Sequence, residues 1–257
     1  MSHSPLNLKD YTIVGVDVDT QNGFANPKGH LYVPAASHVI PNSRKLCQNL
    51  PYLLGSVDAH SYDAWEFAEN GGPFPRHCYK GTEDQLKIHE TRSPKMRFIP
   101  MSEGNVVIGE SVRGEGNRSY LPDRFVQEIR DGVRVYFEKE VYSLFANPNA
   151  KRMIDWLVTD LRARTEKKVL FTVFGYCTGG FCVDEAMHGL KEIIGKECAK
   201  QHNASRMEDD IAVAYITDAV APLSFEPMNG GDPEGWTKRE AQNRGIYEVT
   251  TQEVLDA

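Results

Sequence analysis

The sequence lacks the features that mark membrane proteins, secreted disulfide scaffolds and nucleic-acid-binding proteins. Its longest apolar runs, such as Val169–Gly175, have the length of a strand and are too short to cross a bilayer. The N-terminus shows neither the charged nor the apolar region of a signal peptide, so none is expected. Basic residues do not cluster and the formal net charge is −7, so neither nucleic acid nor a membrane surface is an expected partner.

Cysteine is scarce, odd in number and irregularly spaced, which excludes a disulfide framework. The five cysteines are Cys47, Cys78, Cys177, Cys182 and Cys198. This usage is typical of a reduced, cytoplasmic protein in which one thiol can have a special role.

A length of 257 residues with 40% hydrophobic and 25% charged residues predicts one globular domain. Gly- and Pro-containing polar stretches predict a long insertion around 100–132 and a loop around 224–236.

Apolar, β-branched runs alternate with amphipathic stretches along the chain. Strands are expected over Thr12–Asp19, Leu53–Asp58, Val133–Lys139, Lys168–Gly175, Ile211–Asp218 and Ile246–Val249. Helices are expected within Val39–Leu54 (with Pro41 and Pro51 marking the ends), over Ala150–Ala163, over Cys182–Ile194 and around Arg239–Asn243. This alternation predicts an α/β fold, with a mostly parallel sheet that carries helices on both faces and binds ligands at the carboxyl ends of its strands. A nucleotide-dependent oxidoreductase is disfavoured because no G-x-G-x-x-G follows the first strand.

A carboxylate and two imidazoles recur within a short stretch that follows the second expected strand. Asp58 and His60 are two residues apart in an extended segment, so their side chains share a face. His77 follows in the Pro-flanked loop Phe74–Cys78. Together the three form a ligand set that suits Zn²⁺, Fe²⁺ or Mn²⁺ and leaves positions open for water or substrate. A D-x-H pair is common by chance, so a histidine-containing loop without a metal is the simpler alternative.

Three reactive residues stand where this topology would bring them together. Asp19 ends the first strand, Lys139 ends a middle strand, and Cys182 begins the helix after Lys168–Gly175. The helix dipole favours a thiolate at such a position, a carboxylate can take the thiol proton, and a lysine can hold that carboxylate. The glycine-rich turn at 175–180 suits an oxyanion hole. Taken singly, the cysteine could be a buried apolar residue, the aspartate a turn residue and the lysine a solvated flank. Their joint occurrence at strand ends favours a site.

From Thr12 to Val254 the chain resembles the isochorismatase-like cysteine hydrolases, and among them the nicotinamidases (pyrazinamidases). The matching segments are Asp19-Thr20-Gln21-Asn22-Gly23-Phe24, Asp58-Ala59-His60, Arg76-His77-Cys78-Tyr79-Lys80-Gly81-Thr82, Lys139-Glu140-Val141-Tyr142-Ser143-Leu144-Phe145, Gly175 to Val183, and Asp218-Ala219. The segments with Asp58, His60 and His77 are the discriminating ones, because they are similar to the nicotinamidase metal motif.

The resemblance implies a three-layer fold and the hydrolysis of a small carboxamide, nicotinamide, to nicotinic acid and ammonia through a thioester. It implies Cys182 as nucleophile, Asp19 as acid–base and Lys139 as the third catalytic residue. It also implies one divalent ion on Asp58, His60 and His77, with Zn²⁺ the first choice and Fe²⁺ or Mn²⁺ as alternatives. The substrate-binding residues it implies are Phe24 and Phe74 around the pyridine ring, Tyr142 nearby, and Cys177 and Thr178 in the elbow. A homo-oligomer is expected on the same ground.

The chain departs from the family pattern at several points. Gly23 replaces an acidic residue, and the elbow before Cys182 is one residue longer than usual. The resemblance implies a cis peptide bond between Tyr176 and Cys177, and either Glu66 or water as a further metal ligand. Two alternatives stay open: a related amidohydrolase that acts on another carboxamide or carbamoyl compound, and a non-catalytic homologue.

Overall fold

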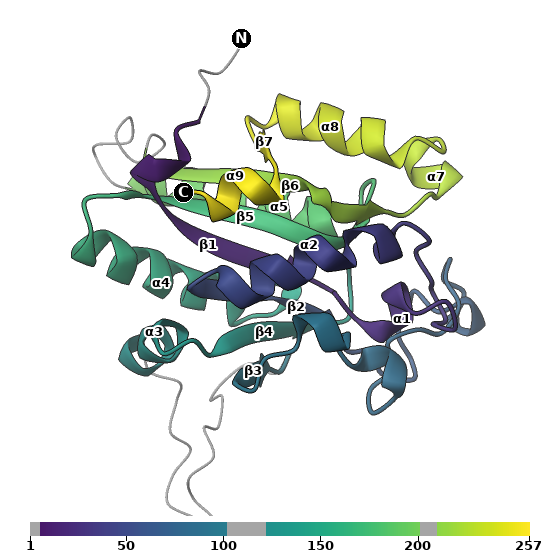
Figure 1. Ribbon diagram of the computed structural model, residues 1–257. Helices are drawn as coiled ribbons and strands as arrows, with labels where there is room; N and C mark the ends of the chain where they lie inside the picture. The colour runs from purple at the N-terminus through teal and green to yellow at the C-terminus, as the bar shows by residue number, and fades with distance from the viewer. Residues whose placement is uncertain (1–5, 102–121, 201–209) are drawn as a thin grey trace, which may run out of the picture.

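One seven-stranded sheet, entirely parallel, forms the centre of the protein in the computed structural model, which describes residues 6–101, 122–200 and 210–257 (Figure 1). The strand order is β3-β4-β2-β1-β5-β6-β7. The strands are β1 (Tyr11–Val18), β2 (Tyr52–Asp58), β3 (Met96–Ile99), β4 (Arg134–Lys139), β5 (Lys168–Thr178), β6 (Ile211–Pro222) and β7 (Tyr247–Val249). The α/β class and the parallel sheet expected from the sequence are confirmed.

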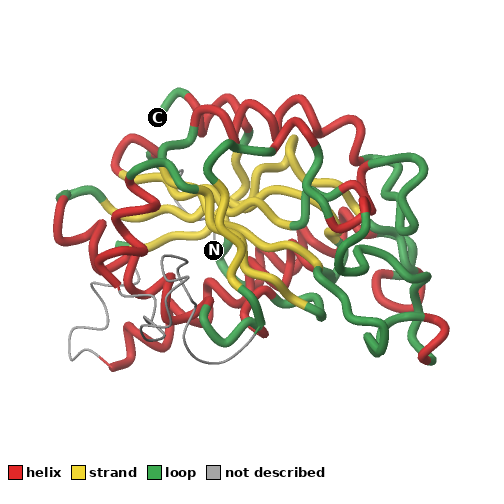
Figure 2. Tube along the Cα trace, turned by 90° about the horizontal axis from the view of Figure 1, so that it is seen from below, coloured by secondary structure: helices red, strands yellow, loops and turns green. Residues whose placement is uncertain are grey.

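Helices cover both faces of the sheet, and Figure 2 shows the strands between them. The helices are α1 (Asn22–Ala25), α2 (Ala36–Asn49), α3 (Pro122–Arg130), α4 (Ala150–Arg164), α5 (Cys182–Lys200), α7 (Glu226–Asn229), α8 (Pro233–Asn243) and α9 (Thr251–Leu255). Alternate residues of β5 separate the two layers: Phe171 and Val173 pack with α4 and α5, whereas Leu170 and Phe174 pack with α2 and α9. This burial on both faces explains why β5 reads as a continuous apolar run.

Two expectations about local structure are wrong. Pro41 does not begin the first long helix but lies inside α2, which starts at Ala36. Proline removes one backbone hydrogen bond there, and the burial of Val39 and Leu46 on the helix face offsets that loss. The region 224–236 is not a simple loop, because it contains α7 and the start of α8. Asp232 caps α8 by accepting a hydrogen bond from the Gly235 amide at 3.0 Å.

The expected insertion around 100–132 is described only at its ends. Residues 102–121 lie outside the described part of the chain, and α3 occupies the C-terminal end of the insertion. The short edge strand β3 and the terminal helix α9 were not expected from the sequence. Among the helices in the described ranges, none combines the length and apolar character needed to span a membrane.

The strand order reverses direction beside β1. From β1 the chain moves to β2 on one side of it, and later returns to β5 on the other side. Open parallel sheets bind ligands at such a switch point, outside the carboxyl ends of the strands. The topology therefore directs the search for a site to the ends of β4, β2, β1 and β5.

Candidate active site

Four neighbouring strands each deliver one polar residue to the carboxyl edge of the sheet. Lys139 ends β4, Asp58 ends β2, Asp19 directly follows β1, and Cys182 begins the helix after β5. The parallel register pairs Asp58 with Lys139 across β2 and β4. All four side chains are buried. The structure thus brings together the residues that the sequence placed at separate strand ends.

Lys139 is the centre of this group. Its Nζ lies 2.8 Å from Asp19 Oδ2 and 3.4 Å from Cys182 Sγ, and it also contacts Asp58 Oδ1. The hydroxyl of Ser56 donates a hydrogen bond of 2.8 Å to the other oxygen of Asp19. Asp19 is therefore fixed from two sides, and one of its carboxylate oxygens lies within 4.8 Å of Cys182 Sγ.

Burial determines the protonation of this group. It raises the pKa of Asp19, and the Lys139 ammonium opposes that shift. Burial also raises the pKa of the Cys182 thiol well above its usual range, although the positive charge of Lys139 opposes this shift as well. Burial alone would lower the pKa of Lys139, but Asp19 and Asp58 hold it well above its usual value. The start of the helix favours a thiolate at Cys182, whereas desolvation raises the pKa of the thiol, so the two effects oppose each other. The thiol needs a base.

Asp58, His60 and His77 converge beside the lysine, as expected for a metal site. One ligand atom from each lies within 4.8 Å of the others. Asp58 Oδ2 is 3.5 Å from His60 Nε2 and 3.8 Å from His77 Nε2. His77 Nδ1 lies 2.8 Å from the Pro75 carbonyl, so this nitrogen is the donor and Nε2 presents a lone pair. Two imidazoles and a carboxylate in this arrangement fit Zn²⁺, Fe²⁺ or Mn²⁺.

His60 gives a further sign that these residues suit a cation. Both of its ring nitrogens are buried without a hydrogen-bond partner, although Glu66 Oε1 lies 2.9 Å from Nε2. Burial alone would lower the pKa of His60, but the carboxylates of Asp58 and Glu66 raise it to about 9. A divalent ion would take the place of that proton. Glu66 contacts His60 but is not part of the group of three whose ligand atoms lie within 4.8 Å of one another, so its role as a further ligand stays a prediction.

Gln21 fixes the backbone of Asp58, a role that the sequence reasoning missed. Its Oε1 accepts a hydrogen bond of 2.7 Å from the Asp58 amide, and its Nε2 donates one of 2.8 Å to the Asp58 carbonyl. The Gln21 side chain thus makes the pair of hydrogen bonds that a neighbouring strand would otherwise make with Asp58. These bonds hold the end of β2 against the turn after β1. The only signal in the sequence was its place in the motif that begins at Asp19.

The fold was compared with known proteins. Neither the scan against protein-family models nor the comparison with curated proteins gave a match. Among solved structures, PnC1 from L. infantum in complex with nicotinate has a TM-score of 0.62 at 14% identity, over 95% of both chains. The pyrazinamidase of Pyrococcus horikoshii in complex with zinc has a TM-score of 0.58 at 19% identity, over 93% of this chain and 99% of the other. N-carbamoylsarcosine amidase from Thermoplasma acidophilum has a TM-score of 0.54 at 18% identity, over 93% of this chain and 96% of the other. The chain shares its fold with these three proteins.

Packing explains one departure from the isochorismatase-like pattern. A Cβ at Gly23 would lie only 2.8 Å from Cys78 Sγ and 3.2 Å from the Asp84 carbonyl oxygen. The thiol of Cys78 and this backbone oxygen therefore occupy the space that an acidic side chain at position 23 would need. The glycine and the cysteine fit each other.

The elbow before Cys182 differs from what the isochorismatase-like pattern implies. The bond between Tyr176 and Cys177 is trans, as are all the peptide bonds in the described ranges, so the expected cis bond is absent; Cys177 instead has a φ of 69°. Gly179 and Gly180, with φ of 95° and 97°, accommodate the extra residue, because glycine adopts positive φ without strain.

The amides of these two glycines are already engaged. Asp184 Oδ2 accepts hydrogen bonds from the amides of Gly179 and Gly180, at 2.8 and 3.0 Å. Neither amide is therefore free to stabilise an oxyanion. The buried residues Cys177 and Thr178 lie directly before this turn, at the end of β5.

The expected ring-binding residues lie beside the metal-ligand candidates. The centroids of Phe24 and Phe74 are 5.6 and 6.1 Å from that of His77. Tyr142 lies 6.4 Å from Phe74. Four further rings that were not expected from the sequence join this group: Phe67 beside His77, Trp65 beside Tyr142, and Phe181 and Phe225 beside Phe74.

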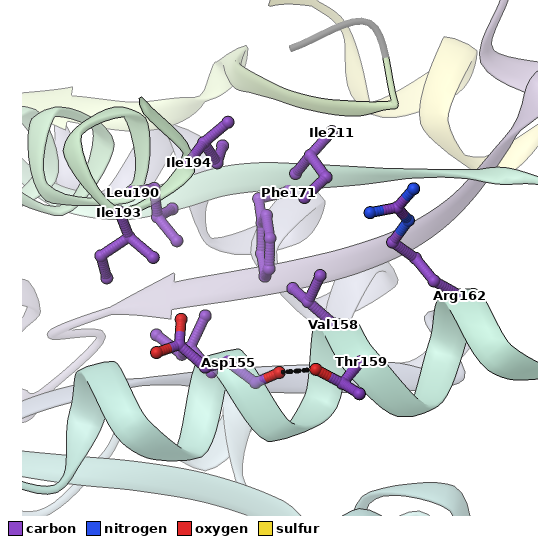
Figure 3. A pocket seen from close by; sticks show the side chains of 10 residues that line it. Asp155, Val158, Thr159, Arg162, Phe171, Leu190, Ile193, Ile194 and Ile211 are labelled. Atoms are coloured by element: carbon purple, nitrogen blue, oxygen red, sulfur yellow. Dashed lines mark hydrogen bonds between the residues drawn. The ribbon is translucent and has the colours of Figure 1, made fainter. Parts of the chain in front are cut away.

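A separate pocket lies away from these residues, between α4 and α5 (Figure 3). It has a volume of about 210 Å³ and is mainly apolar, with Phe171 at its base and Ile193 and Ile194 along α5. Asp155 and Arg162 are its charged residues. Its lining contains no cysteine, histidine or pair of carboxylates, so it offers neither a nucleophile nor a metal site. The residues that could act as nucleophile, base or metal ligand lie instead at the carboxyl edge of the sheet.

Proposed function

We propose that this protein is a metal-dependent nicotinamidase, which hydrolyses nicotinamide to nicotinic acid and ammonia through a thioester on Cys182. The observation that carries the proposal is the position of Lys139, which contacts Asp19, Asp58 and Cys182. It joins the base, a metal-ligand candidate and the nucleophile in one buried group. A structurally similar protein binds nicotinate and another binds zinc, and both support this choice.

Asp58, His60 and His77 would hold the divalent ion, with Glu66 or water as the further ligand. When bound, the ion supplies an electrophilic position that can accept a ring nitrogen of the substrate and orient its carboxamide. The donor set fits this role because His77 Nδ1 bonds to the Pro75 carbonyl, which leaves Nε2 for a ligand, and because His60 Nε2 faces the carboxylate of Asp58. Zn²⁺ is the first choice for two imidazoles and a carboxylate.

The reaction then uses the residues of this chain. Asp19 Oδ2 accepts the proton of Cys182, and the sulfur attacks the carboxamide carbon. A carboxyl group with a raised pKa is suited to this exchange, because its proton affinity approaches that of its partners. Asp19 next gives the proton to the departing ammonia, which leaves a thioester on Cys182. It then takes a proton from water as the water attacks the thioester, and nicotinic acid leaves while the thiol regains a proton.

Lys139 keeps Asp19 in position through both half-reactions and places a positive charge beside the sulfur. The developing oxyanion needs backbone donors, and the engaged amides of Gly179 and Gly180 leave those of Cys182 and of the residues around Thr178 as candidates. One well-placed donor stabilises such a transition state by about 3 kcal/mol.

The proposal is tested by comparing substrates that contain a ring nitrogen with substrates that lack one. The protein, loaded separately with Zn²⁺, Fe²⁺ and Mn²⁺, is assayed for ammonia release from nicotinamide, pyrazinamide, benzamide and a small aliphatic amide. We expect hydrolysis of the two amides whose ring nitrogen can reach the ion, and little hydrolysis of the other two. Equal rates with benzamide and nicotinamide would reject the role of the ring nitrogen.

A carbamoyl compound belongs in the same panel, because one structurally similar protein is an N-carbamoylsarcosine amidase. Preference for that compound over nicotinamide would favour the related hydrolase. A folded, metal-loaded protein that hydrolyses none of these substrates would favour a non-catalytic homologue.

A further inference from the structure

Four aromatic rings pack against one another beside the candidate site, and we name Phe74, Tyr142, Phe181 and Phe225 the aromatic wall. Phe181 directly precedes the nucleophile in the chain, and its ring centroid lies 5.3 Å from Tyr142, 5.9 Å from Phe74 and 6.1 Å from Phe225. Phe74 and Phe225 are 5.4 Å apart. These are the distances of packed aromatic pairs, so no further ring fits between them.

The wall extends from His77, a candidate metal ligand, to the residue that precedes Cys182 in the chain. Phe74 meets the ring of His77 edge-on at 6.1 Å, and Phe181 immediately precedes Cys182. A pyridine ring bound beside His77 would therefore lie near Phe74, which packs against both Phe181 and Phe225. Phe74 and Phe181 are buried, whereas Tyr142 and Phe225 are partly exposed and form the outer part of the wall.

Phe225 reaches the wall from a segment that follows β6, and Asn229 fastens that segment to the elbow. The Asn229 amide group donates hydrogen bonds to the carbonyls of Gly179 at 3.1 Å and Leu223 at 2.9 Å. Its oxygen accepts one from the Phe225 amide at 3.2 Å. The Leu223 amide also donates to the Thr178 carbonyl at 3.1 Å. Asn229 is buried, so the position of Phe225 is fixed relative to the nucleophile.

The longer elbow before Cys182 determines the position of Phe181, the second residue of the wall that this inference uses. Gly180 adopts a φ of 97°, which places Phe181 between the turn and the nucleophile. A Cβ at Gly180 would lie 2.8 Å from the side chain of Met228 in α7, so the elbow and this segment are in close contact. The longer elbow and the segment after β6 therefore pack against each other and together position Phe181 and Phe225.

We propose that Phe225, positioned by Asn229, and Phe181 determine the size of the acyl group that this enzyme accepts. This inference rests on the proposed function and names its substrate class: carboxamides on a single six-membered ring. A fused second ring on the side of the wall would have to displace one of these aromatic side chains from its packed position. Discrimination by a packed apolar pocket against such an addition is expected to be at least about tenfold.

The first test measures kcat/KM for nicotinamide and for quinoline-3-carboxamide, which keeps the ring nitrogen and the carboxamide but adds a fused ring. In Phe225→Ala we expect the ratio of the bicyclic to the monocyclic substrate to rise at least about tenfold. Phe98→Ala is the control, because Phe98 is an exposed phenylalanine on edge strand β3, far along the sheet from Phe225. Its ratio should equal that of the unmodified protein. Phe225→Leu provides a second variant if the alanine variant fails to fold.

The second test does not depend on amide hydrolysis. The rates at which iodoacetamide and N-(1-naphthyl)maleimide alkylate Cys182 are measured by mass spectrometry of the peptide that contains it. Phe225→Ala should accelerate the bulky reagent selectively, and Phe98→Ala should not. Asn229→Ala, which releases Phe225 without removing its ring, should shift the ratio in the same direction.

The two tests separate the size filter from the proposed function. Selective acceleration of the bulky reagent in a protein that does not hydrolyse nicotinamide would reject the function and keep the filter. Hydrolysis of nicotinamide with both ratios unchanged in Phe225→Ala and Phe225→Leu would reject the filter and keep the function. A ratio that rises equally in Phe98→Ala would also overturn it, because the effect would then come from general loosening.

Discussion

Replacing Lys139 by methionine should both destabilise the protein and stop catalysis, and the two effects have different causes. The substitution keeps most of the apolar length of the side chain and removes its charge. Asp19 and Asp58 then lose the ammonium that both contact, inside a fully buried site. Breaking a buried ion pair from one side costs about 3–5 kcal/mol. A protein of ordinary stability, about 5–15 kcal/mol, can lose this amount and still fold.

The catalytic loss should be larger than the loss of stability explains. Without Lys139, Asp19 is no longer held at Oδ2 and its pKa rises further, so it protonates and cannot accept the proton of Cys182. A loss of about 3 kcal/mol of transition-state stabilisation lowers kcat/KM by at least about 100-fold. Urea unfolding measures the stability and ammonia release from nicotinamide measures the activity, both at a temperature where the variant is folded.

The chain offers a matched control in a second buried lysine. Lys87 Nζ lies 2.8 Å from Asp17 Oδ2 and 2.6 Å from Thr20 Oγ1, and its side chain is as buried as that of Lys139. Lys87→Met should therefore lower the free energy of unfolding by a similar amount and keep most of the activity. Equal loss of activity in both variants would refute the reasoning, because catalysis would then follow stability. Full activity in Lys139→Met would refute it as well.

Three further changes test other parts of the site. His77→Ala should release or weaken the bound metal, measured as zinc content after dialysis, and should lower activity on nicotinamide far more than on an aliphatic amide. Asp184→Ala removes the acceptor for two elbow amides and should lower kcat while zinc content stays unchanged; loss of zinc as well would contradict a local effect on the elbow. Burial, together with Arg244, lowers the pKa of His188 to about 4, below the unfolded value of 6.5, so its contribution to stability is complete above pH 6.5 and is lost as pH falls towards 4. Urea unfolding between pH 4.5 and 7 should show a shallower pH dependence in His188→Gln, and an unchanged slope would reject this assignment.

The sequence predicted the central sheet because each strand carries its own signal. Continuous β-branched runs identify buried parallel strands, and polar residues at their ends point to the carboxyl edge. Asp58 and Lys139 meet because parallel register brings the ends of β2 and β4 level. The candidate metal ligands could be placed near each other for the same reason, since His60 is two residues from Asp58.

The remaining features depend on contacts that no local pattern reveals. Phe225 reaches Phe181 only because Asn229 bonds to the elbow, and the chain between β6 and α8 looks like a plain turn region in the sequence. Burial raises the pKa of the Cys182 thiol, whereas the sequence shows only that this residue begins a helix. Pro41 is tolerated within α2 because tertiary packing outweighs one lost hydrogen bond. The single-domain organisation, the homo-oligomeric state and the cytoplasmic location stay predictions.

The account depends most on a thiol and a divalent ion that act on one substrate. The most direct measurement is ammonia release from nicotinamide by the zinc-loaded protein, by the same protein after chelation, and by zinc-loaded Cys182→Ala. We predict turnover in the first sample only, with zinc content equal in the two loaded proteins. Turnover by Cys182→Ala, or undiminished turnover after complete removal of the metal, would contradict the account.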